Sequence, residues 1–153
     1  NDNKNIARTS GINAGIVVSS NISEDVDYTL SYSGNYNISR NSLQEELDNN
    51  YYYHNSGLKL NATFWEGLVL RNEITNMLYS GLGEQYNQNY LLWNLRLGKK
   101  IFSNQNGEIR LSLSDLLDQN KSVSRNVTET YVEDSNNQVL GRYLLLMFTY
   151  TIR

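Results

Sequence analysis

The stretch that decides the fold is 13 residues long and reads Val26-Asp27-Tyr28-Thr29-Leu30-Ser31-Tyr32-Ser33-Gly34-Asn35-Tyr36-Asn37-Ile38. Its even-numbered positions are apolar, aromatic or Gly, and its odd-numbered positions are Asp, Thr, Ser or Asn. This period of two predicts a β-strand with one apolar face and one hydrated face. Strands of soluble proteins usually have about five or six residues, so this segment is unusually long.

Six further segments carry the same alternation, and we therefore expect about seven strands. They lie near residues 11–20, 58–65, 68–75, 91–100, 109–114 and 144–152. The sequence predicts an all-β fold, an antiparallel up-and-down meander of about seven long strands.

The connections between these segments alternate in length. Short turns are expected at Ser20–Asp25, Glu66-Gly67 and Ser103–Gly107, and long polar loops at Ser39–Tyr53, Ser80–Asn89 and Asp115–Gln138. In a meander this rhythm places every short turn at one end and every long loop at the other. Outer-membrane barrels have short periplasmic turns and longer extracellular loops. A soluble β-sandwich binding module also alternates along its strands, but it gives no reason for sorted loops. We therefore favour a transmembrane barrel over the sandwich.

Composition excludes several classes of function. The 153 residues include no Cys, no Pro and one His, with 13 basic and 16 acidic side chains. Without Cys there is no disulfide framework, thiolate metal site or Cys nucleophile. The mean hydropathy of −0.55 and the lack of a long apolar run exclude a membrane-spanning helix. The charge balance gives no electrostatic case for binding nucleic acid, and we expect no metal and no cofactor.

Two stretches are more specific than this general pattern. One reads Asp115-Leu116-Leu117-Asp118-Gln119-Asn120, and the other reads Arg142-Tyr143-Leu144-Leu145-Leu146-Met147-Phe148-Thr149-Tyr150. With the residues between them, they resemble the C-terminal end of TonB-dependent-receptor-like outer-membrane β-barrel proteins of gram-negative bacteria. In that family a similar segment leads into the last long loop, and a similar strand closes the barrel. The resemblance covers residues 107–153.

The resemblance implies a place in the cell outer membrane, contact with its lipid, and a contribution to substrate uptake or binding there. Residues 1–153 would be the C-terminal portion of a barrel domain, without the plug domain and energy-coupling segment of the family. Bacterial barrels made of one chain have an even number of strands. Seven strands therefore predict that the remaining barrel strands come from upstream sequence or from another chain. The alternative is a structural or assembly subunit of a multi-protein outer-membrane complex, with other subunits as partners.

An aromatic cluster at residues 51–54 is the candidate ligand site. Tyr51, Tyr52, Tyr53 and His54 are expected at the extracellular rim, where they would contact a ligand. Tyr is also enriched at membrane interfaces for reasons unrelated to ligands, and we weigh that interpretation beside the first. His54 is the only imidazole and has no partner at a catalytic spacing, so we expect no enzyme activity.

Two sets of charged residues remain. The last long loop contains the acidic residues Asp115, Asp118, Glu129, Glu133 and Asp134, whose spacing matches no calcium loop and which we expect to be solvated. The predicted lumen side contains Arg71, Glu73, Arg96, Lys100 and Arg110, which would pair across neighbouring strands or contact a plug.

Overall fold

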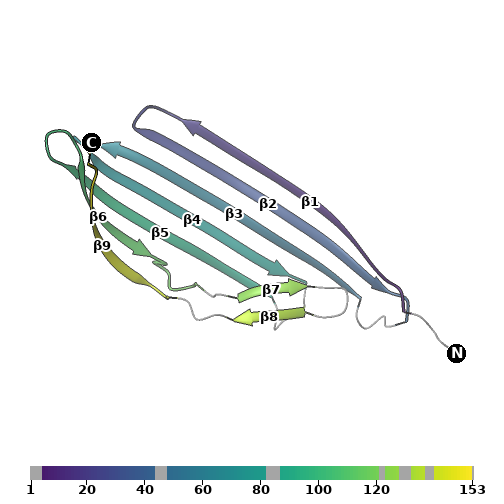
Figure 1. The fold of residues 1–153 in the computed structure, drawn as a ribbon. Coiled ribbons are helices and arrows are strands. Elements are labelled where there is room, and N and C mark those ends of the chain that lie inside the picture. The colour runs from purple at the N-terminus through teal and green to yellow at the C-terminus, as the bar shows by residue number, and fades with distance from the viewer. Residues whose placement is uncertain are drawn as a thin grey trace.

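The computed structural model describes residues 5–43, 48–81, 87–120, 123–127, 132–136 and 140–152, and it contains one large antiparallel sheet (Figure 1). No helix in these ranges is long and apolar enough to cross a membrane. The strands of the sheet are, in spatial order, β1 (Ala7–Asn21), β2 (Val26–Asn41), β3 (Asn49–Phe64), β4 (Leu68–Ser80), β5 (Gln88–Ile101), β6 (Gly107–Ser114) and β9 (Tyr143–Tyr150). Two shorter strands, β7 (Val123–Val127) and β8 (Val132–Asn136), form a separate pair. The predicted meander of seven strands is confirmed.

The two edge strands run in the same direction. Each of the seven strands is antiparallel to its neighbour. Because their number is odd, β1 and β9 both run from the long connections toward the short turns (Figure 1). The sheet therefore has no way to close on itself through an antiparallel pair.

The strand register separates the side chains onto two faces. One face, called the apolar face from here on, carries rows of large apolar residues. Val18, Leu30, Leu58, Ile74 and Trp93 form such a row, lying opposite one another from β1 to β5. The intervening positions form the polar face, which consists mostly of Asn, Ser, Thr and charged residues. Alternation in the sequence thus becomes a two-sided sheet, as expected.

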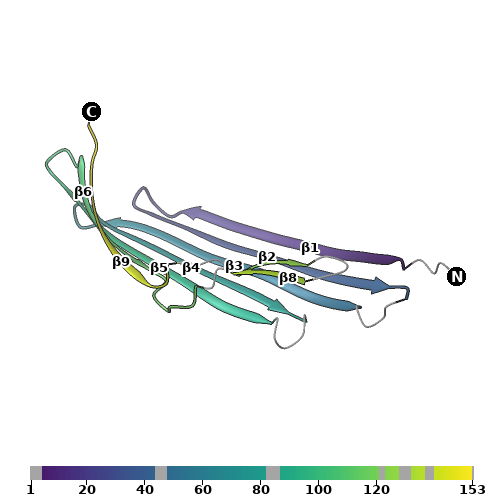
Figure 2. The same ribbon diagram turned by 60° about the horizontal axis from the view of Figure 1, so that its bottom comes forward.

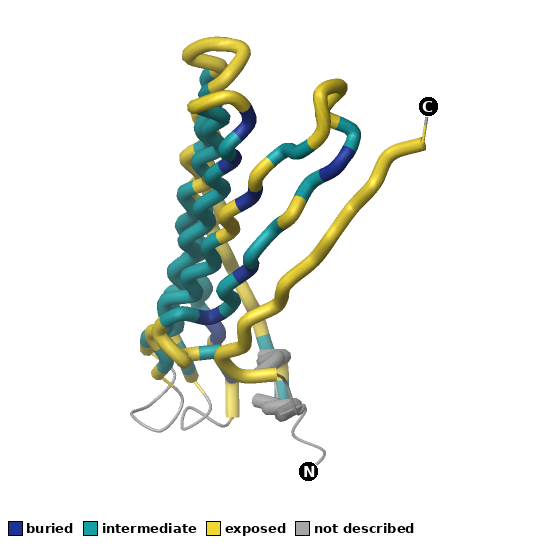
Figure 3. The backbone as a smooth tube through the Cα atoms, turned by 90° about the vertical axis from the view of Figure 1, so that its left-hand side faces the viewer, coloured by how far each residue is buried: buried dark blue, intermediate teal, exposed yellow. Residues whose placement is uncertain are grey.

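The apolar face has no cover. Val69 is the one buried apolar side chain among the described residues, and Ile12, Leu146 and Phe148 are 75%, 68% and 60% exposed. Figure 3 shows β9 exposed along its whole length. A sandwich would bury this face against a second sheet. The exposed apolar surface instead suits contact with lipid, because apolar side chains are unfavourable in water but not in hydrocarbon.

The sheet is curved. In Figure 2, β6 and β9 bend away from the plane of β1 to β5. Curvature of this kind is what a segment of barrel wall requires, because a flat sheet does not close.

The loops are sorted as the sequence predicts. The short connections 22–25, 65–67 and 102–106 lie at one end of the sheet, and the strand ends that flank the long connections 42–48, 81–87 and 115–142 lie at the other (Figure 1). The tight turn after β3 uses three successive left-handed residues, Trp65, Glu66 and Gly67, with φ of 44°, 54° and 97°. Trp65 is therefore a turn residue and not part of the strand.

The predicted loop Ser39–Tyr53 is wrong, because strands occupy most of it. β2 continues to Asn41 and β3 begins at Asn49, which reduces the connection to 42–48. Residues 49–56 read Asn-Asn-Tyr-Tyr-Tyr-His-Asn-Ser, so neither side of this segment is apolar enough to show alternation. Backbone pairing with β2, from Ser39↔Asn49 onward, holds it in the sheet all the same.

The predicted loop Asp115–Gln138 also needs correction, since it contains the β7–β8 pair. The pairing runs from Val123↔Asn136 to Val127↔Val132. Five-residue strands in a polar stretch give too short a pattern to recognise. At the other end of β9 the strand stops at Tyr150, so Ile152 lies beyond it.

Candidate functional site

The four residues of the predicted ligand site lie in β3 and alternate between the two faces. Tyr52 and His54 are on the apolar face, opposite Tyr36 and Gly34 of β2. Tyr51 and Tyr53 are on the polar face. The strand therefore divides the cluster, and the four side chains do not line one surface. Their role in ligand binding stays a prediction.

The His54 imidazole belongs to a chain of hydrogen bonds on the apolar face. The amide nitrogen of Asn76 donates to Asn89 Oδ1 at 2.8 Å and to the Tyr90 carbonyl at 3.1 Å, so Asn76 Oδ1 is left as an acceptor for His54 Nε2 at 3.0 Å. His54 Nδ1 then accepts from the Tyr52 hydroxyl at 3.2 Å. The polar groups of this chain satisfy one another, which an apolar surrounding demands.

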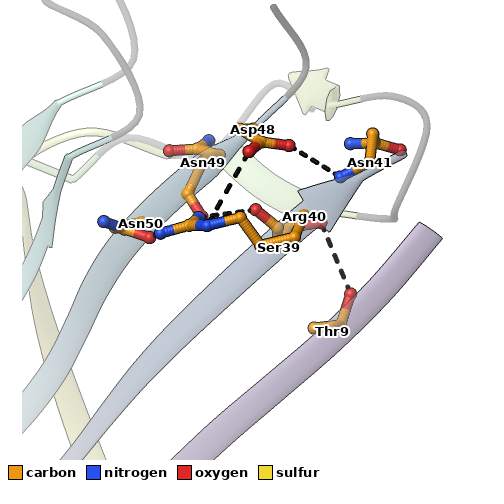
Figure 4. Close-up of polar contacts among 7 residues, drawn as sticks. All are labelled: Thr9, Ser39, Arg40, Asn41, Asp48, Asn49 and Asn50. Carbon is orange, nitrogen blue, oxygen red and sulfur yellow. Dashed lines mark hydrogen bonds and ion pairs between the residues drawn. The ribbon is translucent and has the colours of Figure 1, made fainter. Parts of the chain in front are cut away.

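A second polar network lies at the end of the sheet from which the long connections leave (Figure 4). The Arg40 guanidinium donates to Asn50 Oδ1 at 2.8 Å and to the Ser39 carbonyl at 2.7 Å, and it lies 3.7 Å from the Asp48 carboxylate. The other oxygen of Asp48 accepts the Asn41 backbone N–H at 2.6 Å. These contacts join the end of β2 to the start of β3 and therefore have a structural role.

Asp115 organises the turn that follows β6. Its carboxylate, in a residue only 4% exposed, accepts the backbone N–H groups of Gln119 at 3.0 Å and Asn120 at 2.9 Å. Asp118 Oδ1 accepts the backbone N–H of Arg142 at 3.1 Å, which links this turn to the start of β9. We expected Asp115 to be a solvated loop charge, and its burial shows that this was wrong.

The remaining acidic residues of the last loop are Glu129, Glu133 and Asp134. No group of three metal-binding side chains occurs in the described part of the chain. Glu129 lies outside the described residues, and Glu133 and Asp134 belong to β8.

The polar face carries its charges in the half nearer the short turns, and most of them are basic. Cross-strand pairing, which the sequence predicts, occurs between Lys59 Nζ and Glu73 Oε1, which are 3.2 Å apart on directly opposed positions of β3 and β4. Glu108 Oε1 accepts from Arg110 Nε at 2.8 Å, two residues along β6. The charged side chains of this face in the seven strands are Lys59, Arg71, Arg96, Lys100 and Arg110 against Asp27, Glu73 and Glu108.

Arg71 and Arg96 depart from the predicted pairing because they lie directly opposite each other in β4 and β5. A pocket of about 160 Å³ opens beside them, lined also by Lys59, Asn61 and Asn94 and by Asn72 and Glu73. Lys59, Asn61 and Asn94 were not among the residues that the sequence suggested. Only the strand register brings them together, and the sequence does not state the register.

Comparison with known proteins identifies a family. A family model described as "Outer membrane protein beta-barrel family" matches residues 1–150 of the chain. A search of curated proteins and a search of solved structures each find no match.

Proposed function

Because the chain belongs to the outer membrane protein β-barrel family and is located in the outer membrane, we propose that it forms part of the wall of a barrel that captures or takes up a solute. The observation that carries this proposal is the group of charged side chains on the polar face, in the half of the sheet nearer the short turns. Charged side chains within membrane-spanning strands need water or ionic partners. With lipid on the apolar face, a hydrated lumen on the other side supplies that water.

The orientation follows from the sorted connections. In this class of barrel the short turns face the periplasm and the longer loops face the outside. The connections 42–48, 81–87 and 115–142 then form the extracellular rim, and the network around Arg40 braces it. A solute arriving from outside meets this rim before it reaches the charges of the lumen.

Further strands complete the barrel in this proposal. Unpaired edges within a bilayer cost several kcal/mol for each unsatisfied backbone group. β1 and β9 have no partner on their outer edges among the described strands. We propose that strands from upstream sequence or from another chain pair with both edges.

The finer assignment is a TonB-dependent-receptor-like barrel. It is supported by the resemblance over residues 107–153 and by the compact turn at Asp115, which connects through Asp118 to the backbone of Arg142. A scaffold in a multi-protein outer-membrane complex is the competing role, and the open edges suit it equally.

Planar-bilayer conductance distinguishes uptake from scaffolding. The intact assembly that contains this chain would be purified from native membranes in mild detergent and reconstituted in concentrated KCl, before and after urea is added to displace any material that fills the lumen. Conductance steps in either condition support a hydrated wall that solutes pass. Silence in both conditions, with a correctly folded barrel, contradicts uptake and favours the scaffold.

A further inference from the structure

Arg71 and Arg96 stand side by side on the polar face although they carry the same charge. They are directly opposed in β4 and β5, a position at which side chains of neighbouring strands come close to each other. Like charges at such a position destabilise a sheet. A sheet that contains two opposed arginines therefore needs a negatively charged group that offsets their repulsion.

The acidic residues nearby are already engaged. Glu73 pairs with Lys59 at 3.2 Å, and Glu108 accepts from Arg110 at 2.8 Å. Asp27 Oδ1 accepts the amide of Asn61 at 2.8 Å. Within the described ranges neither Arg71 nor Arg96 has a carboxylate within 4.0 Å. In this part of the chain neither guanidinium forms an ion pair, and the carboxylate that interacts with Arg71 at longer range, Glu108, is already bound to Arg110.

The pocket next to them has the size and the donors for a small anion. Its volume of about 160 Å³ exceeds the roughly 30 Å³ that one water occupies in the liquid. Asn94, which also lines the pocket, uses its Oδ1 to accept the Asp115 backbone N–H at 3.0 Å, so its NH₂ group remains as a donor. Guanidinium groups present paired N–H donors that match carboxylate and phosphate oxygens.

We propose that Arg71 and Arg96 form an oxyanion-binding site on the lumen wall, which takes a carboxylate or phosphate group of a solute. The site rests on the proposed function, because it names the chemical class of solute that the lumen would bind. The pocket lies in the half of the wall nearer the short turns, since Arg71 is close to the start of β4 and Arg96 is close to the end of β5. A captured anion would therefore be held below the rim.

The test measures binding of inorganic phosphate, and separately of citrate, to the intact detergent-purified assembly by titration calorimetry at low ionic strength. We expect saturable binding that weakens about tenfold or more in Arg71→Gln and in Arg96→Gln, because each loses charge-assisted hydrogen bonds. Arg71→Glu should abolish binding, since the new carboxylate would pair with Arg96. Arg71→Glu is also expected to fold, because its ion pair with Arg96 replaces a repulsion between like charges. Loss of binding in this variant is therefore not explained by misfolding.

Arg8→Gln is the matched control. It removes one positive charge from an exposed position of β1, on the apolar face and away from the pocket, and binding should be unchanged. Every variant is checked for the heat-dependent shift in gel mobility that folded barrels show. The proposal is overturned if the wild type binds neither anion before or after urea treatment, or if folded Arg71→Gln and Arg71→Glu bind as the wild type does.

Binding and conductance separate the two proposals. Conductance without arginine-dependent anion binding removes the oxyanion site and leaves the proposed uptake role standing. Arginine-dependent binding in an assembly that never conducts removes the uptake role and leaves the site. An acidic plug segment that occupies the pocket would be a different source of the same chemistry. In that case phosphate would bind only after urea has displaced the segment.

Discussion

Asp115 shows how much one side chain contributes to a barrel rim. Asp115→Ala removes the acceptor for two backbone N–H groups, at Gln119 and Asn120, in a residue that is 4% exposed. We expect the free energy of unfolding of the complete barrel to fall by about 1–3 kcal/mol. Urea titration in lipid vesicles, followed by Trp fluorescence, measures this change.

Asp115→Asn is the control for that change. It keeps one acceptor oxygen and tolerates the left-handed backbone at this position, where φ is 50°. Its loss of stability should be the smaller of the two. Equal stability of the wild type and Asp115→Ala would show that water replaces the carboxylate without cost.

Gly81 is a second residue at which the backbone dictates the amino acid. Its φ is +92°, and an added Cβ would collide with the backbone carbonyl oxygen of Asn50. Gly81→Ala should destabilise the barrel by more than about 1 kcal/mol in the same urea titration. Gly34→Ala, in the middle of β2, meets only the end of the Tyr32 side chain at 3.2 Å and should change stability less. The reverse order would contradict the geometry at Gly81.

Single residues were also the hardest feature to predict from the sequence. The charges at Arg71, Glu73, Arg96 and Arg110 were expected on one face, and they lie there. Their partners depend on register, and a shift of one strand by two residues would change every pair without altering the alternation. For that reason the sequence did not reveal that Arg71 and Arg96 oppose each other.

At the scale of one strand, β4 offers a test of which face meets lipid. Ile74 lies on the apolar face between Leu58 and Trp93, and the next residue, Thr75, lies on the polar face. Ile74→Arg should lower the free energy of unfolding by about 2–4 kcal/mol if it lies near the bilayer midplane. Thr75→Arg places the same side chain in the lumen and should cost much less. Urea unfolding of the two variants in the same vesicles compares them directly.

The comparison of Ile74→Arg with Thr75→Arg has a clear contrary outcome. If Thr75→Arg were the more damaging change, the polar face would be the one that excludes water. That result would contradict a hydrated lumen on the polar face.

Strands were predictable where one face was apolar and the other polar. The strand from Val26 was recognised because its alternation is unbroken, and it proved longer than expected, reaching Asn41. β3 was recognised only from Leu58 onward, because Asn49–Ser56 presents polar and aromatic groups on both faces. Strand ends that extend beyond lipid have water on both sides, so they leave no hydropathy signal.

For the whole molecule, the odd number of strands predicts that β1 and β9 are not neighbours in the finished barrel. Cysteines introduced at Val17 in β1 and at Leu145 in β9, both on the polar face, should not form a disulfide in native membranes. The chain has no Cys of its own, so the readout is clean. Gel mobility without reductant detects the crosslink.

A cysteine pair across the neighbouring strands β1 and β2 is the positive control for disulfide formation. Val17 lies directly opposite Ser31, so Val17→Cys with Ser31→Cys should crosslink efficiently. Moving the β9 cysteine to Met147 or Thr149 guards against a register mismatch. A strong β1–β9 crosslink at any of these positions would show that the seven strands close on themselves.

Overall organisation was read from the sequence more fully than the site was. Loop lengths are visible as gaps between alternating segments, so the sorting of short and long connections was foreseen and is confirmed. The exposed apolar surface was predicted from the alternation of apolar and polar residues along each strand. In the proposed barrel, what fills or closes it depends on groups beyond these seven strands, and no pattern within them encodes it.

The parallel direction of β1 and β9 also restricts stoichiometry. If two copies of this chain stood upright in the same membrane, the β9 of one and the β1 of the other would meet as parallel strands at both junctions. Symmetry therefore gives no antiparallel ring from identical copies, however many are added. A segment that completes the wall through antiparallel pairs must have outer strands that run opposite to β1 and β9, and a second upright copy of these seven does not have them.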